Sequence, residues 1–182
     1  MPEVSIIILT YNSSSYIQEL LKSIKEANPN FSDYEIILVD NLSTDDTLNK
    51  LKPFKNEITI KKNDKNLGFA RGINTGAKNA KGNYLLFINP DTQFHKGNIN
   101  DLVSVFQKFK NAGIVGGKLF DKNGKMEKSA GRFFGLVEII LMSLGLDETF
   151  GVRASPNHTK KVDFVSGGFM MVKKEVFEKL NG

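Results

Sequence analysis

Short apolar runs alternate with amphipathic stretches over the first 110 residues. Runs of apolar, largely branched side chains predict strands at 4–9, 35–39 and 84–88, and 57–62 predicts a more polar strand. Apolar residues at helical spacing predict helices around 17–24, 43–51, 69–80 and 99–106. Crossovers of about ten or more residues join parallel strands. The order therefore predicts an α/β protein with a Rossmann-like, mostly parallel twisted sheet flanked by helices on both faces.

Two of these helices are preceded by polar residues suited to capping. Ser15 and Gln18 have the spacing of a capping box, and Ser43 precedes the second helix. We therefore expect Ser15 and Ser43 to cap the first two helices.

The pattern changes after Lys110, where simple alternation stops. The elements expected beyond it are a strand at 114–120, a turn at 121–124, a strand at 162–172 and a helix at 175–180. Ser166-Gly167-Gly168 interrupts the later strand. A length of 182 residues suits one domain, with 1–110 and 111–182 as its two halves.

The segment 133–146 is strongly apolar, although Glu138 and two glycines interrupt it. At about 14 residues it is too short to span a bilayer. Its pattern fits a core or covering helix, which we expect, and also an interfacial helix that touches lipid.

Composition narrows the functional classes. The chain has no cysteine, which excludes a disulfide, a thiolate nucleophile and a cysteine metal site and fits a reducing compartment. We expect a cytoplasmic protein, with contact at the inner face of the membrane left open. The net charge of +5 suits an anionic substrate, a membrane surface or simply solvated lysines. We expect no nucleic-acid partner, because the phenylalanines are not interleaved with arginines.

Several catalytic signatures are missing. Thr10-Tyr11-Asn12-Ser13 follows the first strand without a glycine, so the dinucleotide fingerprint is absent, and no phosphate-binding P-loop occurs. There is no Gly-x-Ser-x-Gly nucleophile turn. His95 and His158 fall in loops without metal-ligand spacing.

Three strands end in polar residues that should meet along one edge of a parallel sheet. The three ends are Thr10-Tyr11-Asn12, Asp40-Asn41 and Asn89-Pro90-Asp91. Ligands bind at the carboxyl edge of such sheets. Asp91 fits a metal or phosphate site or an Asx turn, and Asp40 fits contact with a base or ribose or a cap on the next helix.

Gly68, Gly72 and Gly76 recur every four residues in the third predicted helix. Each interior glycine costs about 1 kcal/mol relative to alanine, so close packing or a ligand against bare backbone must compensate. Arg71 and Asn74 lie off this stripe, near the helix start. There an arginine could pair with a diphosphate that also feels the helix dipole.

Four ordered motifs together resemble family 2 glycosyltransferases of the GT-A fold, most closely the bacterial rhamnosyltransferase-type members. They are Thr10-Tyr11-Asn12, Val39-Asp40-Asn41-x-Ser43-x-Asp45-x-Thr47, Asn66-x-Gly68-Phe69-Ala70-x-Gly72-x-Asn74-x-Gly76 and Asn89-Pro90-Asp91. The segments 164–172 and 177–182 resemble the family's later signature, so the likeness covers nearly the whole chain.

The resemblance implies a site for a nucleoside-diphosphate sugar of the UDP or dTDP type. Asp91 would match the last acid of the family's Asp-x-Asp motif and hold Mn²⁺ or Mg²⁺ against the diphosphate, although Asn89 replaces the first acid. Ser166, Gly167 and Gly168 would form an acceptor or donor-sugar loop. The nucleotide-sugar-binding residues it implies are Thr10, Tyr11, Asn12, Asp40, Asn66, Gly68, Arg71, Asn74, Asn89 and Asp91.

The resemblance also implies inverting transfer to a glycan or lipid-linked acceptor in cell-surface polysaccharide synthesis. The family's general base follows a motif that is not present before Gly182, and Glu175 and Glu178 are expected to be helix-surface residues. We therefore expect a truncated domain. Its first half, 1–110, would bind the nucleotide sugar, and 111–182 would be an incomplete acceptor and catalytic half with little or no activity alone. The alternative is a noncatalytic nucleotide-binding module.

Overall fold

The computed structural model describes residues 1–29, 33–146 and 149–182. They form two compact units, Met1–Ile114 with Gly167–Gly182 and Val115–Ser166, which we call the sheet unit and the insert unit. The last strand and helix of the chain thus belong with its first 114 residues. The predicted boundary at 110/111 lies near the point where the chain first leaves the sheet unit, and the chain returns to that unit at Gly167.

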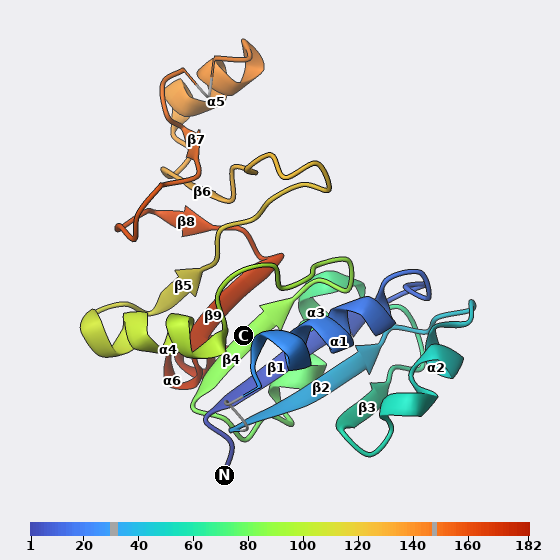
Figure 1. Ribbon diagram of the computed structural model, residues 1–182. Helices are drawn as coiled ribbons and strands as arrows, with labels where there is room; N and C mark the ends of the chain where they lie inside the picture. The colour runs from blue at the N-terminus through green and yellow to red at the C-terminus, as the bar shows by residue number, and fades with distance from the viewer. Residues whose placement is uncertain (30–32, 147–148) are drawn as a thin grey trace. The chain divides into compact units, whose positions relative to one another are not determined.

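The sheet unit is built on a six-stranded sheet of order β3-β2-β1-β4-β9-β5 (Figure 1). The edge strand β5 lies at the boundary between the two units. β1 pairs in parallel with β2 and β4, and β2 with β3, whereas β9 runs antiparallel to β4. The predicted mostly parallel sheet is confirmed. The strands are β1 (Val4–Thr10), β2 (Tyr34–Asp40), β3 (Ile58–Lys62), β4 (Tyr84–Ile88), β5 (Ile114–Gly116) and β9 (Phe169–Lys173).

Helices cover both faces of this sheet. Ile7 and Phe87 belong to a buried cluster with α3, whereas Tyr84, on the opposite face of β4, stacks on Phe106 of α4 with ring centroids 4.9 Å apart. Figure 1 shows α1 and α4 in front of the sheet and α3 behind it. The helices are α1 (Ile17–Ala27), α2 (Thr47–Lys50), the 3₁₀ turn η1 (Lys52–Phe54), α3 (Gly68–Ala77), α4 (Ile99–Lys108) and α6 (Lys174–Lys179).

Both predicted caps are wrong. α1 follows Tyr16 without a side-chain cap, and the Gln18 amide donates to the Lys50 carbonyl instead, at 2.8 Å. Ser43 lies ahead of α2, which starts only after Asp46, and its hydroxyl accepts from the backbone N–H of Asn12. In both cases the polar side chain forms a hydrogen bond with a residue that is distant in sequence. Local spacing cannot reveal such a partner.

The insert unit has a small antiparallel sheet of order β7-β6-β8, with α5 (Leu136–Ser143) between β6 and β7 in the chain. Its strands are β6 (Ala130–Gly131), β7 (Arg153–Ala154) and β8 (Phe164–Val165). The predicted strand at 162–172 is in fact two strands, β8 and β9, in different sheets. The predicted strand at 114–120 is regular only to Gly116.

The predicted turn at 121–124 is confirmed. The Asp121 carboxylate accepts from the backbone N–H groups of Asn123 and Lys125, and Gly124 has a φ of 77°. Phe120 and Met126 form a bridge across the turn.

α5 lies within the apolar segment 133–146, but none of its residues is buried in the described chain. A helix is present as predicted, yet the insert unit does not bury it as a core or covering helix. No helix among the described residues is long and apolar enough to cross a membrane.

Two glycines of α3 allow its backbone to approach the sheet closely. A Cβ on Gly72 would lie 2.5 Å from a methyl carbon of Leu9, and one on Gly76 would lie 2.6 Å from a methyl carbon of Ile7. Packing therefore accounts for two members of the glycine stripe. Gly68 differs: it is the first residue of α3, has a φ of 75° and has no atom within 4 Å of its Cβ position.

We predict that Gly76→Ala destabilises the protein, because the added methyl group would overlap Ile7 and Val39. Overpacking of this kind costs about 1–3 kcal/mol, which exceeds the gain in helix propensity. The free energy of unfolding measured in denaturant should fall by about that amount. Gly113→Ala is the matched control, because its Cβ would meet Val176 at an ordinary 3.6 Å. A more stable Gly76→Ala protein would refute this account of the α3 contact.

Candidate functional site

The candidate site is the carboxyl edge of the parallel strands. β1 lies between β2 and β4. The chain passes from β1 to β2 on one side and reaches β4, on the other side of β1, only later. This reversal of strand order makes the carboxyl end of β1 the topological switch point of the sheet. α3 runs from β3 back to β4, so its N-terminus lies at the same edge. Four segments therefore converge: the loops after β1, β2 and β4 and the first turn of α3.

Asn12 ties the loop after β1 to the loop after β2. Its φ of 51° turns the side chain so that the amide oxygen accepts from the backbone N–H of Thr44 at 2.8 Å and, more weakly, of Asp45 at 3.4 Å. Its own N–H donates to the Ser43 hydroxyl at 3.0 Å. Asn12 was predicted to border a nucleoside, and in the structure it shapes the two loops that would do so.

Asp45 makes a second tie between the same loops. Its carboxylate accepts from the backbone N–H of Ser14 at 3.1 Å and from the N–H and hydroxyl of Thr47. The Thr47 hydroxyl in turn accepts from the Ser13 N–H at 2.8 Å. The hydrogen bond from the Thr47 hydroxyl, with smaller contributions from Ser14 and the Thr47 backbone, holds the pKa of Asp45 well below its ordinary value of 3.8.

Asp40 and Thr10 are buried beneath these loops. The Asp40 side chain accepts from the Thr10 hydroxyl at 3.4 Å and from the backbone N–H of Ser43 at 3.2 Å, and Asp40 is only 2% exposed. The structure thus gives this carboxylate a definite part in positioning the loop after β2. Its contact with a base or ribose remains a prediction.

Asn41 joins three segments through one buried amide. Its oxygen accepts from the Asn63 side chain and from the Leu67 N–H, both at 3.0 Å, and its nitrogen donates to the Asn66 side chain at 2.7 Å. Asn66 also accepts from the Gly68 N–H at 2.9 Å. Asn41 was expected at this edge only as part of the polar end of β2, without a role of its own, although a buried amide directly after a strand needs several partners.

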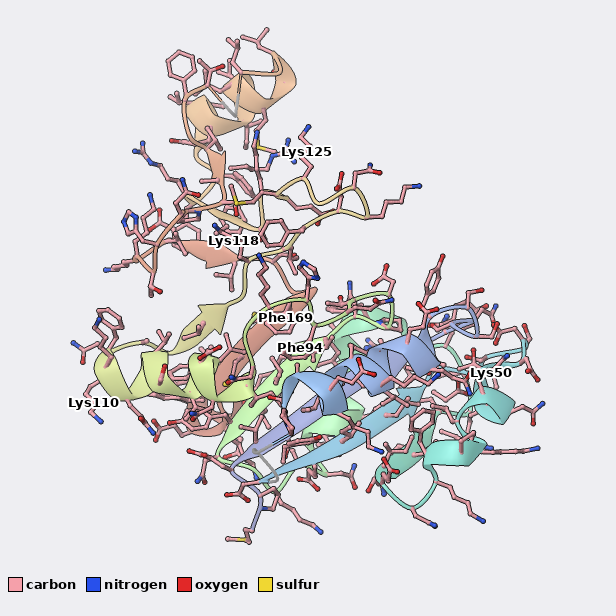
Figure 2. All side chains as sticks on the ribbon, in the orientation of Figure 1. Lys50, Phe94, Lys110, Lys118, Lys125 and Phe169 are labelled. Atoms are coloured by element: carbon pink, nitrogen blue, oxygen red, sulfur yellow. The ribbon has the colours of Figure 1, made fainter. Side chains whose placement is uncertain are left out.

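Asn89 and Asp91 lie at the end of β4, beside the start of β9. The Asn89 N–H donates to the Gly168 carbonyl at 2.9 Å, and the Phe94 ring packs edge-on against Phe169 with centroids 5.3 Å apart (Figure 2). Asp91 is exposed, and in the described chain its carboxylate accepts no backbone hydrogen bond. The Asx-turn alternative for Asp91 is thereby excluded here.

The predicted residues of α3 point to different surroundings. Arg71 is exposed in the first turn, as a residue that meets an anion at the helix N-terminus must be. Asn74 lies one turn further on, and its amide occupies the space that a Cβ on Gly182 would need, 2.4 Å away. Asn74 therefore packs against Gly182, in the segment that follows α6.

The predicted loop Ser166-Gly167-Gly168 is divided between the two units. The Ser166 N–H donates to the Ser129 carbonyl at 2.7 Å within the insert unit. Gly167 belongs to the sheet unit, and its Cβ position is 3.8 Å from the Phe69 ring at the start of α3. Gly167 and Gly168 therefore join the candidate site, whereas Ser166 belongs to the other unit.

The donor groups at this edge fit a divalent cation only if it is shared with a ligand. Within the described residues there is no cluster of three His, Cys, Asp or Glu side chains that could hold a metal. Asp91 alone offers an exposed carboxylate at the end of β4. Mg²⁺ and similar ions are often held by one or two carboxylates together with substrate phosphates and water, which matches this sparse set.

A model of the family described as glycosyl transferase family 2 matches residues 5–181, nearly the whole chain. The chain belongs to this family. The match runs through all the loops described above. The finer likeness to rhamnosyltransferase-type members remains a prediction.

Two curated relatives show where family 2 sequences of this kind occur. The poly(ribitol-phosphate) β-N-acetylglucosaminyltransferase TarS of Staphylococcus aureus is 32% identical over 104 residues, 56% of this chain and 18% of that protein. A poly(ribitol-phosphate) β-glucosyltransferase of Bacillus spizizenii is 34% identical over 127 residues, 68% of this chain and 20% of that protein. This chain thus spans about a fifth of the length of either relative.

Solved structures confirm the GT-A fold expected for the family. The crystal structure of TarS residues 1–349 matches all of this chain with a TM-score of 0.68 at 21% identity, using 49% of its own length. The same TarS fragment in complex with UDP matches 63% of this chain with a TM-score of 0.56 at 28% identity, using 34% of its own length.

We predict that Asp45→Asn loosens the loops after β1 and β2, because an amide is a weaker acceptor for Ser14 and Thr47. The backbone amides of Ser14 and Thr47 should exchange with solvent faster, whereas that of Ile99, bonded to Asn28, should not change. In the wild-type protein, the stabilisation from Asp45 is complete above pH 3.8 and is lost as the pH falls below it, since the folded-state pKa is depressed. Unchanged exchange at both amides would contradict the proposed tie.

Proposed function

We propose that this chain carries the nucleotide-sugar-binding part of an inverting glycosyltransferase. The transferred sugar would pass from a UDP- or dTDP-linked donor to a glycan or lipid-linked acceptor in cell-surface polysaccharide synthesis. The observation that carries the proposal is a convergence at one sheet edge. The loops after β1 and β2, which are hydrogen-bonded to each other, meet there with the N-terminus of α3 and the exposed carboxylate of Asp91. Family membership and the UDP complex of TarS support a nucleotide donor.

In this proposal the loops after β1 and β2 bind the nucleoside. Tyr11 is 51% exposed in the loop after β1, where an aromatic face can border a base. The backbone around it is already held by the ties through Asn12 and Asp45. Asp40 acts here mainly by fixing residue 43, and the base would rest against the loop that it supports.

The first turn of α3 and the end of β4 would receive the diphosphate. The helix N-terminus offers partial positive charge, and Arg71 adds a full charge that can form paired hydrogen bonds to phosphate oxygens. Asp91 would hold Mn²⁺ or Mg²⁺ together with the substrate phosphates. When bound, such an ion neutralises the charge that develops on the leaving nucleoside diphosphate.

Transfer also needs a base to deprotonate the acceptor hydroxyl. Glu175 and Glu178 are poorly placed for this, because β9 runs antiparallel to β4 and α6 begins beside Tyr84, at the opposite edge of the sheet. Glu178 lies 3.8 Å from Lys174 on the same helix. We therefore propose that the base comes from outside residues 1–182 and that this chain alone binds donor without transferring sugar. A noncatalytic module would bind the nucleotide equally well but would stay inactive in any longer product of the same gene.

We predict that Arg71→Gln weakens binding of UDP by about 10- to 100-fold, the loss expected for a charge-assisted hydrogen bond. Isothermal titration calorimetry measures the change. Lys78→Gln is the matched control, because it removes an exposed cation from the other end of α3. Equal affinities of the two variants for UDP would contradict the proposed diphosphate position.

We predict that Asp91→Asn weakens UDP binding on the order of 10-fold or more in the presence of Mn²⁺, because the ion loses a charged ligand. Without a divalent ion, the same substitution should leave the affinity nearly unchanged. The exposed loop position implies little effect on stability, which thermal unfolding checks. A UDP affinity that is unchanged by the substitution in saturating Mn²⁺ would count against a metal at Asp91.

A further inference from the structure

The connection from β4 to α4, residues 89–98, carries Asp91 and is hydrogen-bonded along α1. Three bonds join it, and the first residue of α4, to α1 and the C-cap residue of α1. They run from the Gln93 side chain to the Glu19 carboxylate at 2.8 Å, from the Phe94 N–H to the Ser23 hydroxyl at 3.1 Å and from the Ile99 N–H to the Asn28 side-chain oxygen at 2.8 Å. The donors and the acceptors follow one another in the same order along the chain, so α1 serves as a template for the connection.

α1 is itself held firmly against the sheet. Its inward-facing residues are each at most 1% exposed, and they are Ile17, Leu20, Leu21 and Ile24. The helix follows directly on the loop after β1, because the Ser13 carbonyl accepts from the N–H groups of Tyr16 and Ile17 at 3.1 Å. The same helix therefore adjoins both the loop proposed to border the nucleoside and the connection that carries Asp91.

Asp91 lies in a tight turn directly after β4. The Asn89 N–H donates to the Gly168 carbonyl at 2.9 Å, and the Thr92 N–H donates to the Asn89 carbonyl at 3.1 Å, which closes the turn. Pro90 is the second residue of this turn, a position that suits the fixed φ of proline. The backbone of Asp91 is thus fixed on its N-terminal side.

Phe94 fixes the connection on the other side of Asp91. Its ring packs edge-on against Phe169, the residue labelled beside it in Figure 2, with centroids 5.3 Å apart. Its backbone N–H donates to the Ser23 hydroxyl. A ring contact limits the side chain but lets the backbone pivot, whereas a hydrogen bond to the N–H is directional and sets the backbone. Four residues, 90–93, separate this anchor from the one at Asn89.

Among the three bonds to α1, the one from Ser23 controls Asp91 most directly. The Gln93 and Glu19 side chains are exposed, so water competes for their bond. Ile99 is buried, but it lies eight residues beyond Asp91. The bond from Phe94 to Ser23 is partly buried and only three residues away.

The Ser23 hydroxyl uses both its donor and its acceptor capacity. It donates to the Leu20 carbonyl at 2.8 Å, which leaves its oxygen free to accept from the Phe94 N–H at 3.1 Å. Serine is a poorer helix former than alanine. The bond to the connection after β4 is therefore what this serine adds to α1.

We propose that Ser23 is a positioning residue for Asp91: its hydroxyl holds the connection after β4 against α1, so that the Asp91 carboxylate stands where it can bind a divalent ion on the donor's diphosphate. Ser23 itself touches neither the ion nor the nucleotide. Because α1 also adjoins the loop after β1, it sets the spacing between the nucleoside and the ion. The proposal rests on the proposed function of Asp91 as a ligand of that ion.

Ser23→Ala tests the proposal, because alanine removes the hydroxyl and suits a helix better than serine does. In saturating Mn²⁺, calorimetry should show UDP binding about 3- to 10-fold more weakly than to the wild-type protein, the loss expected for one neutral hydrogen bond. Without a divalent ion, the affinity for UDP should not change. Ser23→Thr keeps a hydroxyl and should restore the affinity in Mn²⁺.

Two comparisons separate positioning from a general effect on the fold. Ser104→Ala is the matched control and should leave UDP binding unchanged. The Ser104 hydroxyl donates to the carbonyl of Asp101, three residues earlier, at 2.7 Å, but within the described residues it accepts no backbone N–H. In an Asp91→Asn background, Ser23→Ala should not weaken UDP binding in Mn²⁺ any further, because it acts only through that carboxylate.

Hydrogen exchange gives a readout that needs no ligand. In Ser23→Ala the Phe94 amide loses its acceptor and should exchange with solvent about 3- to 10-fold faster. The Ile99 amide keeps its bond to Asn28 and should not change.

The outcomes distinguish this proposal from the proposed function. If Mn²⁺ does not strengthen UDP binding by the wild-type protein, the metal position at Asp91 fails and the role of Ser23 fails with it. If Mn²⁺ does so and Asp91→Asn abolishes the gain while Ser23→Ala keeps it in full, only the role of Ser23 is overturned. Equal losses of UDP affinity with and without Mn²⁺ in Ser23→Ala, or unchanged exchange at Phe94, would overturn it as well.

Discussion

The close approach of α3 to β1 and β2 is the constraint on which the candidate site depends. Gly72 and Gly76 present bare backbone to Leu9 and Ile7, where a methyl group would overlap. Each glycine costs about 1 kcal/mol of helix propensity, a loss that the packing must offset. Because these contacts hold α3 against the sheet, its first turn stays at the carboxyl edge, where Asn66 meets the amide of Asn41.

At that edge, the buried and exposed polar groups have different tasks. The side chains of Asn41 and Asp40 are buried, and their hydrogen bonds hold the loops after β2 and β3. Tyr11, Arg71 and Asp91 are exposed to solvent. Loops that are already ordered lose less conformational entropy when a ligand binds, so the buried network serves binding without itself needing to contact the ligand.

The two units bury their apolar residues to very different extents. In the sheet unit, strands such as β1 are buried on both faces, with Ile6, Ile7 and Ile8 at most 1% exposed. The insert unit holds short two-residue strands and an apolar helix with no buried residue in the described chain.

The sequence by itself determined the first four strands, their parallel crossovers and the strand ends that meet at the carboxyl edge, because apolar periodicity and strand ends are local signals. The tertiary structure decided what each polar side chain does there. Ser43 and Gln18 bond across about thirty residues and do not form the predicted caps, Asn74 meets Gly182, and Ser166 falls in a different unit from Gly167. A hydrogen bond is short and directional, so its partner depends on which distant segment the fold brings within about 3 Å, and no local pattern encodes that.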